Sequence, residues 1–234
     1  MDSKIEQVKK YELTTESKDY LGHKLFRIRA LISFKFVAKG ELGGFVESEK
    51  NVSHSGNAWV SGNARVYGDA RVSGNARVYG DARVSGDAWV YGDAQVYGDA
   101  WVSGNAQVSG NAQVSGNAQV SGDAWVSGNA QVSGDAQVSG NARVSGNAQV
   151  YGNAQVSGDA KIEISTDSFV AGPIGSRSGF ITFTKSNMTA TTGCFYGTIA
   201  KFTAAVKKTH GENQHAKNYL ALVEMVKAMW EESN

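Results

Sequence analysis

The chain contains little cysteine, little histidine and little net charge, and these shortages exclude several classes of protein. Its 234 residues include one cysteine and four histidines. A single thiol cannot form a disulfide framework or a multi-cysteine metal cluster. The formal net charge is only +1, so no strong field draws the chain toward nucleic acid or an anionic membrane. We therefore expect a protein that binds neither nucleic acid nor membranes.

Long hydrophobic runs are also missing from the sequence. No window approaches the ~18 consecutive apolar residues of a membrane span. The first residues, MDSKIEQVKKYELTTE, lack the apolar stretch of a secretory signal peptide. The simplest expectation is a soluble protein that stays in the cytoplasm.

Glycine, by contrast, is abundant, and a six-residue repeat accounts for it. Valine recurs at every sixth position from Val60 to Val156, and Ile162 takes the next place. Each unit reads V-[SY]-G-[ND]-A-x, where x is Gln, Arg or Trp. Strand alternation places Ala and Val on one side and x and Ser or Tyr on the other. The Gly-Asn and Gly-Asp pairs tolerate positive φ, so each unit predicts a short strand followed by a corner.

This pattern resembles the hexapeptide repeat of left-handed parallel β-helices. The resemblance implies that three hexads make one triangular coil, and successive coils stack ~4.8 Å apart at normal strand spacing. We therefore predict a mainly β protein: a left-handed parallel β-helix of about six triangular coils over residues 54–162. A small β cap would precede it over residues 1–53, and an α+β domain of a hairpin and two helices would follow over residues 163–234.

The position of the histidines argues against the enzymes that share this fold. The proteins that this resemblance points to include acyltransferases and zinc-dependent carbonic anhydrases, whose catalytic or metal-binding histidines lie in the coils. Here no histidine lies between Val60 and Ile162 and no loop interrupts the repeat, so three imidazoles for zinc cannot come from the coils. We expect no enzyme, metal or cofactor, and an acyltransferase-like enzyme is the disfavoured alternative. His54 shares the phase of the later valines and is expected in the N-terminal cap.

The outward positions predict a surface for self-association. Residues 18 apart should stack, and one column then reads Arg71, Trp89, Gln107, Trp125, Arg143, Lys161. Tryptophan and arginine are enriched where binding energy concentrates. We interpret Arg71, Trp89, Tyr91, Trp125 and Arg143 as the interface of a homo-oligomer, with a trimer as the usual assembly of such prisms. The alternative, that the tryptophans only cover neighbouring backbone, stays open.

The flanking segments predict capping structures at both ends of the solenoid. Residues 10–34 read as two strands joined by the polar segment ESKDYLGH, and residues 185–187 should turn a second hairpin. Two helices follow, with Thr198 and Asn213 as N-caps and Gly211 ending the first. Their apolar stripes, expected to pack on the solenoid end or a partner subunit, are Ile199, Phe202 and Val206, then Tyr219, Leu220, Val223, Val226 and Trp230.

One stretch has the chemistry of an anion site, GPIGSRSG at residues 172–179. Its glycines let backbone N–H groups approach an anion, Ser176 adds a hydroxyl, and Arg177 supplies a forked cation for phosphate or carboxylate. The P-loop spacing is absent, and a simple turn is the alternative. The predicted ligand-binding residues are Gly175, Ser176, Arg177, Lys185, Cys194 and His210. Catalysis by Cys194 with His210 as base is a minor alternative.

The flanks carry a second resemblance. The segments LGGFVESEKNVSHSGNAWV, GPIGSR and GCFYGT…THG, together with the hexads, resemble an uncharacterised group of β-solenoid proteins encoded by phages and prophages. The resemblance implies a viral accessory protein acting inside a bacterium, with no established activity. We expect a non-enzymatic oligomeric binding protein that inhibits host antiviral defence, by sequestering a nucleotide-like signal or binding a host defence protein. A structural part of the virion or of its assembly is the alternative.

Overall fold

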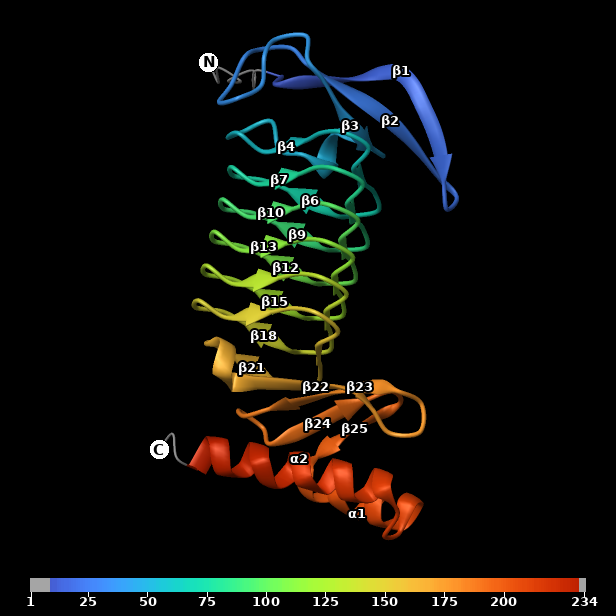
Figure 1. Cartoon of the computed structure of the whole chain (residues 1–234). Coiled ribbons are helices and arrows are strands. Elements are labelled where there is room, and N and C mark those ends of the chain that lie inside the picture. The colour runs from blue at the N-terminus through green and yellow to red at the C-terminus, as the bar shows by residue number, and fades with distance from the viewer. Residues whose placement is uncertain (1–8, 232–234) are drawn as a thin grey trace.

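The computed structural model describes residues 9–231. The chain forms three stacked parts: a β-hairpin cap, a triangular solenoid, and a small sheet covered by two helices (Figure 1). Among the described residues, no helix is both long and apolar enough to cross a membrane. The fold is mainly β, as predicted.

Three parallel sheets form the sides of the solenoid, and each strand is an x-Val pair of the repeat. Side I holds β4 (Trp59–Val60), β7 (Arg77–Val78), β10 (Gln95–Val96), β13 (Gln113–Val114), β16 (Gln131–Val132) and β19 (Gln149–Val150). Side II holds β5 (Arg65–Val66), β8 (Arg83–Val84), β11 (Trp101–Val102), β14 (Gln119–Val120), β17 (Gln137–Val138) and β20 (Gln155–Val156). Side III holds β6 (Arg71–Val72), β9 (Trp89–Val90), β12 (Gln107–Val108), β15 (Trp125–Val126), β18 (Arg143–Val144) and β21 (Lys161–Ile162).

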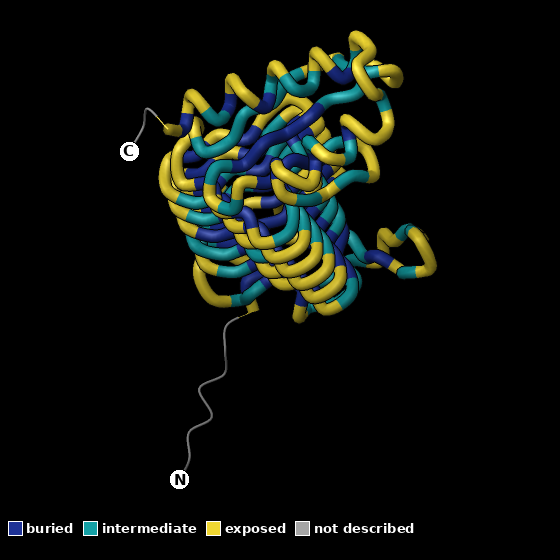
Figure 2. The backbone as a smooth tube through the Cα atoms, turned by 90° about the horizontal axis from the view of Figure 1, so that it is seen from below, coloured by how far each residue is buried: buried dark blue, intermediate teal, exposed yellow. Residues whose placement is uncertain are grey.

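Valine and alanine fill the interior, because their side chains alternate inward on every side. Every repeat alanine and valine from Ala58 to Ile162 is at most 1 % exposed and belongs to one continuous core. The glycine-containing corners lie outside and are largely exposed (Figure 2). The predicted inward set is therefore confirmed, and the left-handed sense of the coil stays a prediction.

An additional turn precedes the repeat and brings the solenoid to about seven turns. Strand β3 (Leu42–Val46) pairs in parallel with β5, so that Val46 faces Val66, and Val52 bridges to Val72. Both pairs are 20 residues apart rather than 18, so two residues are inserted before Val60. The expected phase of His54 is therefore wrong, since Val52 takes that place, and this turn lies within the segment expected as the cap.

Parallel pairing joins neighbouring turns by hydrogen bonds in both directions, and one set of these bonds runs from each turn to the following one. Amide N–H groups of each turn donate to carbonyls of the following turn, as from Gln131 to Ala148 and from Ser133 to Val150, both at 2.9 Å. At the N-terminal end of the solenoid, the carbonyls that receive this set of bonds have no preceding turn, and at the C-terminal end the N–H groups that make it have no following turn. Buried backbone groups of either kind need partners, so these carbonyls need donor caps and these N–H groups need acceptor caps.

Donor side chains satisfy the N-terminal end. Lys10 Nζ donates to the carbonyls of Gly56 and Ala58 at 3.4 and 2.8 Å. The side-chain amide of Asn51, in the short helix η1 (Glu49–Asn51), donates to two more carbonyls at 3.0 and 2.9 Å. Lys10 is 1 % exposed, and this burial lowers the pKa of its ammonium to about 8. A buried cation is tolerated here because it serves otherwise unpaired acceptors.

The N-terminal hairpin consists of β1 (Tyr11–Tyr20) and β2 (His23–Ala30), which continue the sheet of side II through β3. The two predicted strands are confirmed, although most of the expected polar turn is strand and the turn itself is only Leu21–Gly22. His54 stacks on Tyr11 with ring centroids 4.5 Å apart, so it does lie in the cap. Trp59 is the x residue before Val60, and the repeat pattern therefore places it on the exterior. It is only 4 % exposed because Tyr11 and Phe34 cover it.

A four-stranded antiparallel sheet closes the C-terminal end. Its strands, in order, are β22 (Ser168–Ile174), β23 (Gly179–Thr184), β24 (Thr189–Thr192) and β25 (Phe195–Thr198), after the short helix η2 (Ser165–Asp167). Helices α1 (Ile199–His210) and α2 (Gln214–Glu231) pack on this sheet (Figure 1).

The predicted hairpin at 185–187 and both N-caps are confirmed. Thr198 Oγ1 accepts from the Lys201 amide at 3.3 Å, and Asn213 Oδ1 accepts from the Ala216 amide at 3.0 Å. Gly211 follows α1 with φ +56°. The apolar stripes of the helices form a core with the small sheet, and this sheet lies between them and the solenoid. The helices thus pack mainly on the sheet, and Trp230 Nε1 also donates to the Thr166 carbonyl of η2, just after the last solenoid strand, at 3.1 Å.

Candidate ligand pocket of the C-terminal domain

Two loops and two helices converge at one end of the small sheet. Because the strands are antiparallel, the loop after β22 and the loop after β24 lie at the same end. The first contains Ser176 and Arg177, and the second contains Cys194. Thr192, which was not among the predicted ligand-binding residues, lies at the same end. Its Oγ1 donates to the Phe180 carbonyl at 2.8 Å and so links β24 to β23 there.

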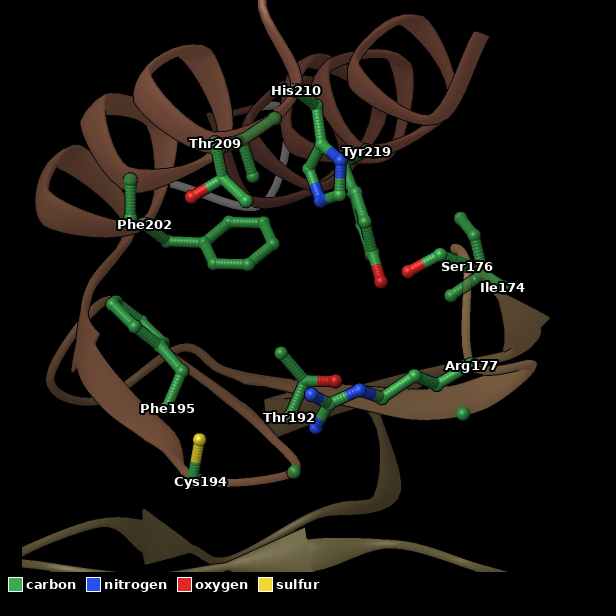
Figure 3. Close-up of a pocket in the computed structure, with 14 residues that line it drawn as sticks. Ile174, Ser176, Arg177, Thr192, Cys194, Phe195, Phe202, Thr209, His210 and Tyr219 are labelled. Atoms are coloured by element: carbon green, nitrogen blue, oxygen red, sulfur yellow. The ribbon is translucent and has the colours of Figure 1, made fainter.

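These elements enclose a pocket of about 360 Å³. Its polar lining includes Ser176, Arg177, Thr192, Cys194, Thr209 and His210. In Figure 3 the Arg177 side chain extends across the pocket toward Thr192, and the hydroxyls of Ser176 and Tyr219 point toward each other. The volume lies within the range of small-molecule sites in proteins.

Arg177 is the cation of this pocket. Arg177 is exposed, and none of the ion pairs within residues 9–231 involves its guanidinium. A guanidinium offers two parallel N–H groups to a carboxylate or phosphate. The pocket can therefore receive an anionic group without first breaking a salt bridge.

Aromatic rings form the opposite wall of the pocket. Phe195 and Phe202 have ring centroids 5.3 Å apart, and Phe202 meets Tyr219 edge to face at 5.5 Å. The His210 ring lies 5.9 Å from that of Tyr219 and reaches into the pocket beside it (Figure 3). Rings that hold one another in such geometry offer a preformed apolar surface to a planar ligand.

Gly175 acts through close packing. A Cβ at this position would lie 2.0 Å from Tyr219 Oη, and the residue has φ +76°. A side chain is therefore excluded on two grounds, and glycine lets the loop approach α2. Gly175 thus shapes the pocket edge and is not among its lining residues.

The structure brings four of the six predicted ligand residues together: Ser176, Arg177, Cys194 and His210. Lys185 is not one of them. It follows β23, at the opposite end of the sheet from the pocket loops. The prediction for Lys185 is therefore wrong for this pocket, because the hairpin turn separates it from Arg177 by the length of the strand.

Sequence reasoning missed several lining residues: Ile174, Thr192, Phe195, Thr209 and Tyr219. Tyr219 was assigned only to the apolar stripe of its helix. The one sequence signal for these residues was the strand alternation of FITFT (180–184) and MTATTGCF (188–195). It predicts a hairpin whose two open ends lie next to each other. Nothing in the sequence shows that α1 and α2 cover that end of the sheet.

The outward column of side III has the predicted register. Trp89 pairs with Arg71 and Gln107, and Trp125 pairs with Gln107 and Arg143. We call the column Arg71, Trp89, Gln107, Trp125, Arg143 and Lys161 the Trp column. Trp89 and Trp125 are 42 % and 38 % exposed. The ring centroids of Trp89 and Tyr91 are 4.5 Å apart.

Both exposed indoles also bind the preceding turn. Trp89 Nε1 donates to Ser73 Oγ at 3.1 Å, and Trp125 Nε1 donates to Ser109 Oγ at 3.2 Å. The tryptophans are therefore tied to side chains of their own solenoid, while a large part of each ring still faces solvent. Self-association through this column stays a prediction.

Within residues 9–231, no group of three or more His, Cys, Asp and Glu side chains could hold a metal ion. Cys194 is a free, exposed thiol. Cys194 and His210 enter the pocket from opposite sides (Figure 3), and no hydrogen bond in the described part of the chain joins them. The nucleophile and base pairing considered from the sequence has no geometric support.

The fold and the stacked hexads define a β-solenoid protein with a pocket in its C-terminal domain. The repeats match the family model described as YdcK Beta solenoid repeat, over residues 58–74, 64–78, 76–92, 94–110, 112–128, 118–134 and 136–152. These matches lie within the solenoid and do not extend to the pocket. No curated protein matches the chain.

Proposed function

We propose that the protein is a non-enzymatic binding protein whose C-terminal pocket holds a small anionic molecule with an aromatic ring, as nucleotides have. The observation that carries this proposal is the presence of Arg177, without an ion-pair partner in the described chain, opposite a wall of aromatic rings in one pocket of about 360 Å³. The guanidinium would bind phosphate or carboxylate, and the rings would contact the planar group.

The role of such binding follows from the resemblance of the flanking segments to the phage and prophage group. We propose that the protein is phage-encoded, acts in the cytoplasm of the bacterial host, and inhibits antiviral defence by sequestering a nucleotide-like signal. Binding of a host defence protein is the alternative way in which it would inhibit antiviral defence. Sequestration needs affinity and no chemical step, which is consistent with the separation of Cys194 and His210 in the pocket.

We also propose that the Trp column forms the interface of a homo-oligomer, most simply a trimer. Its support is the exposure of Trp89 and Trp125 two turns apart on one side, with Arg71 and Arg143 at the neighbouring levels. Exposed aromatic and arginine side chains of this kind are typical of protein interfaces. An oligomer would present several copies of the pocket.

Native mass spectrometry tests the ligand proposal directly. The protein is purified from bacteria with an active nucleotide-signalling defence system. We expect an added mass the size of a nucleotide on the wild type, lost in Arg177→Ala and retained in Lys185→Ala. Lys185 is the matched control because it lies at the other end of the same sheet.

A structural role in the virion is the second candidate, since seven stacked turns make a stiff prism. The discriminating measurement is the protein content of purified phage particles. A ligand-free chain found in those particles would overturn the sequestration proposal and favour a structural part.

A further inference from the structure

The C-terminal end of the solenoid is not capped equally on its three sides. Because one set of amide N–H groups in each turn donates to the following turn, the last turn presents donors of this set that have no following turn. That last turn contains β19 on side I, β20 on side II and β21 on side III.

Acceptor side chains of the C-terminal domain cap two of these strands. On β20, the Gln155 amide donates to Thr182 Oγ1 at 2.8 Å. On β21, the Lys161 amide donates to Ser186 Oγ at 2.8 Å, and the Glu163 amide that follows donates to the Asp167 carboxylate at 2.8 Å. Hydroxyl and carboxylate oxygens thus replace the carbonyls of an absent turn.

Strand β19 differs from the other two. One turn earlier, Gln131 and Ser133 donate to carbonyls of this strand region, and Gln149 and Tyr151 occupy the equivalent places. Within residues 9–231, neither the Gln149 amide nor the Tyr151 amide has a hydrogen-bond acceptor. The edge of side I therefore presents two backbone donors, both pointing along the solenoid axis, away from the strands already paired.

A cavity of about 210 Å³ adjoins this edge. Val150, which is 1 % exposed, and the apolar side chains of Phe169 and Val170 line it together with Ser165. Tyr151 also lines it and is 65 % exposed. Donors and an apolar recess thus occur side by side, which is the combination that a bound peptide strand uses.

We infer that the β19 edge binds an extended peptide segment of a partner protein, which adds to side I as a seventh strand. Two carbonyls of the segment, two residues apart, accept from the Gln149 and Tyr151 amides. In the pairing one turn earlier, the accepting carbonyls belong to Ala148 and Val150, whose side chains face inward, so the two accepting residues of the segment are expected to carry small apolar side chains that enter the cavity. The site is separate from the pocket that contains Arg177.

The spacing of the donors favours a peptide over a small anion. Amides two residues apart in a strand are ~6.6 Å apart, from a rise of about 3.3 Å per residue. The carbonyls of an extended peptide repeat at the same interval, so both bonds form with good geometry. The two oxygens of one carboxylate are too close together to accept from both amides at once.

A second copy stacked end to end is disfavoured by the opposite cap. The acceptors that would complete this edge are the first-turn carbonyls of side I, and Lys10 already occupies those of Gly56 and Ala58. Head-to-tail pairing would have to remove a buried ammonium from its partners, which costs free energy. The partner is therefore expected to be a different chain.

The test uses the full-length protein and a synthetic probe peptide of one hexad plus a glycine, acetyl-Gly-Asn-Ala-Gln-Val-Ser-Gly-amide, which has the chemistry of an added strand. Hydrogen exchange followed by NMR or mass spectrometry should show slower exchange of the Gln149 and Tyr151 amides when peptide is present. Amides on the covered strand β20 should not change. Unchanged exchange at residues 149–151 with millimolar peptide would overturn the proposal.

Variants separate the backbone donor from the side chain. Gln149→Pro removes the donor amide, whereas Gln149→Ala keeps it and serves as the matched control. We expect fluorescence anisotropy of labelled peptide to give about tenfold weaker binding for Gln149→Pro and wild-type affinity for Gln149→Ala. Equal affinity of the two variants, with both folded by circular dichroism, would contradict the inference. Self-association that Gln149→Pro abolishes would also overturn it, by showing that a second copy occupies the edge.

Discussion

The solenoid and the C-terminal domain position their exposed chemistry in different ways. In the solenoid, a residue's neighbours are those 18 positions away, so Trp89 lies between Arg71 and Gln107. In the C-terminal domain, the pocket combines residues from Ile174 to Tyr219 that no period relates. The comparison shows that repetition builds regular faces, while a concave site needs loops of different length that meet at one place. Four changes would break or sharpen this contrast.

The largest effect is expected inside the repeat. Val132 is fully buried between Val114 and Val150, and Val132→Asp would place a carboxylate in the apolar core. We expect a loss of about 4 kcal/mol or more in the free energy of unfolding, measured in urea. Gln131→Asp is the control, because its side chain is exposed on the same strand. Similar losses for the two variants would contradict the inward and outward assignment.

Removal of the N-terminal cap should have the next largest effect. Lys10→Met keeps the apolar stem and leaves the Gly56 and Ala58 carbonyls without their donor, at a cost of about 1–3 kcal/mol. Lys9→Met is the control, since Lys9 only pairs with Glu49 on the surface and should cost less than about 1 kcal/mol. Equal costs would show that the buried ammonium is not a cap.

Lys10 should also make the free energy of unfolding depend on pH. The pKa of Lys10 is lowered from 10.5 to about 8 by burial, so between these values the unfolded chain binds more protons than the folded one. Stability contributed by this group therefore rises as pH increases from 8 toward 10.5. Thermal unfolding of the wild type across this window should show the rise relative to Lys10→Met. Parallel curves for the two proteins would be the contrary result.

A smaller effect on stability is expected at the edge of the pocket. Gly175→Ala introduces a Cβ at a residue with φ +76° and against Tyr219 Oη, and should cost about 1–2 kcal/mol. Because Tyr219 must move, ligand binding seen by native mass spectrometry should be lost as well. Gly179→Ala has open space around its Cβ and is the control for stability. Retained binding in Gly175→Ala would show that this contact does not shape the pocket.

The smallest effect on stability, with a large effect on assembly, is expected from Trp89→Ser combined with Trp125→Ser. Each change removes one indole hydrogen bond to serine, about 1 kcal/mol or less. Light scattering after gel filtration should show loss of the oligomer. Trp101→Ser on side II is the control, since Trp101 makes the same bond to Ser85 away from the Trp column. An unchanged oligomer in the double variant would exclude this interface.

Most of the solenoid could be predicted because its period is visible in the sequence. The inward valines, the three columns and the corner glycines all follow from a repeat of six with two residues per strand. The first turn could not be predicted in this way, since the two-residue insertion between Val52 and Val60 changes the phase and moves His54 into the cap. Trp59 was misassigned for a related reason: its cover comes from Tyr11 and Phe34, which lie outside the repeat.

For the pocket, local chemistry was predictable and proximity was not. The loop with Ser176 and Arg177 was recognisable from its glycines and its cation, and Thr198 and Asn213 marked the starts of the helices. The tertiary structure decided which end of the sheet each loop occupies. That placement brings Cys194, His210 and Tyr219 beside Arg177 and keeps Lys185 away from them.

The sequence by itself determined a β-solenoid and its inner and outer residues, because short-range alternation and an 18-residue stacking distance are properties of the chain. Only the tertiary structure decided which donors and acceptors cap the two ends, which side is left uncapped at β19, and which loops enclose the pocket. Those outcomes depend on contacts between segments far apart in sequence, such as Lys10 with Ala58 and Thr182 with Gln155. No local pattern specifies contacts of that kind.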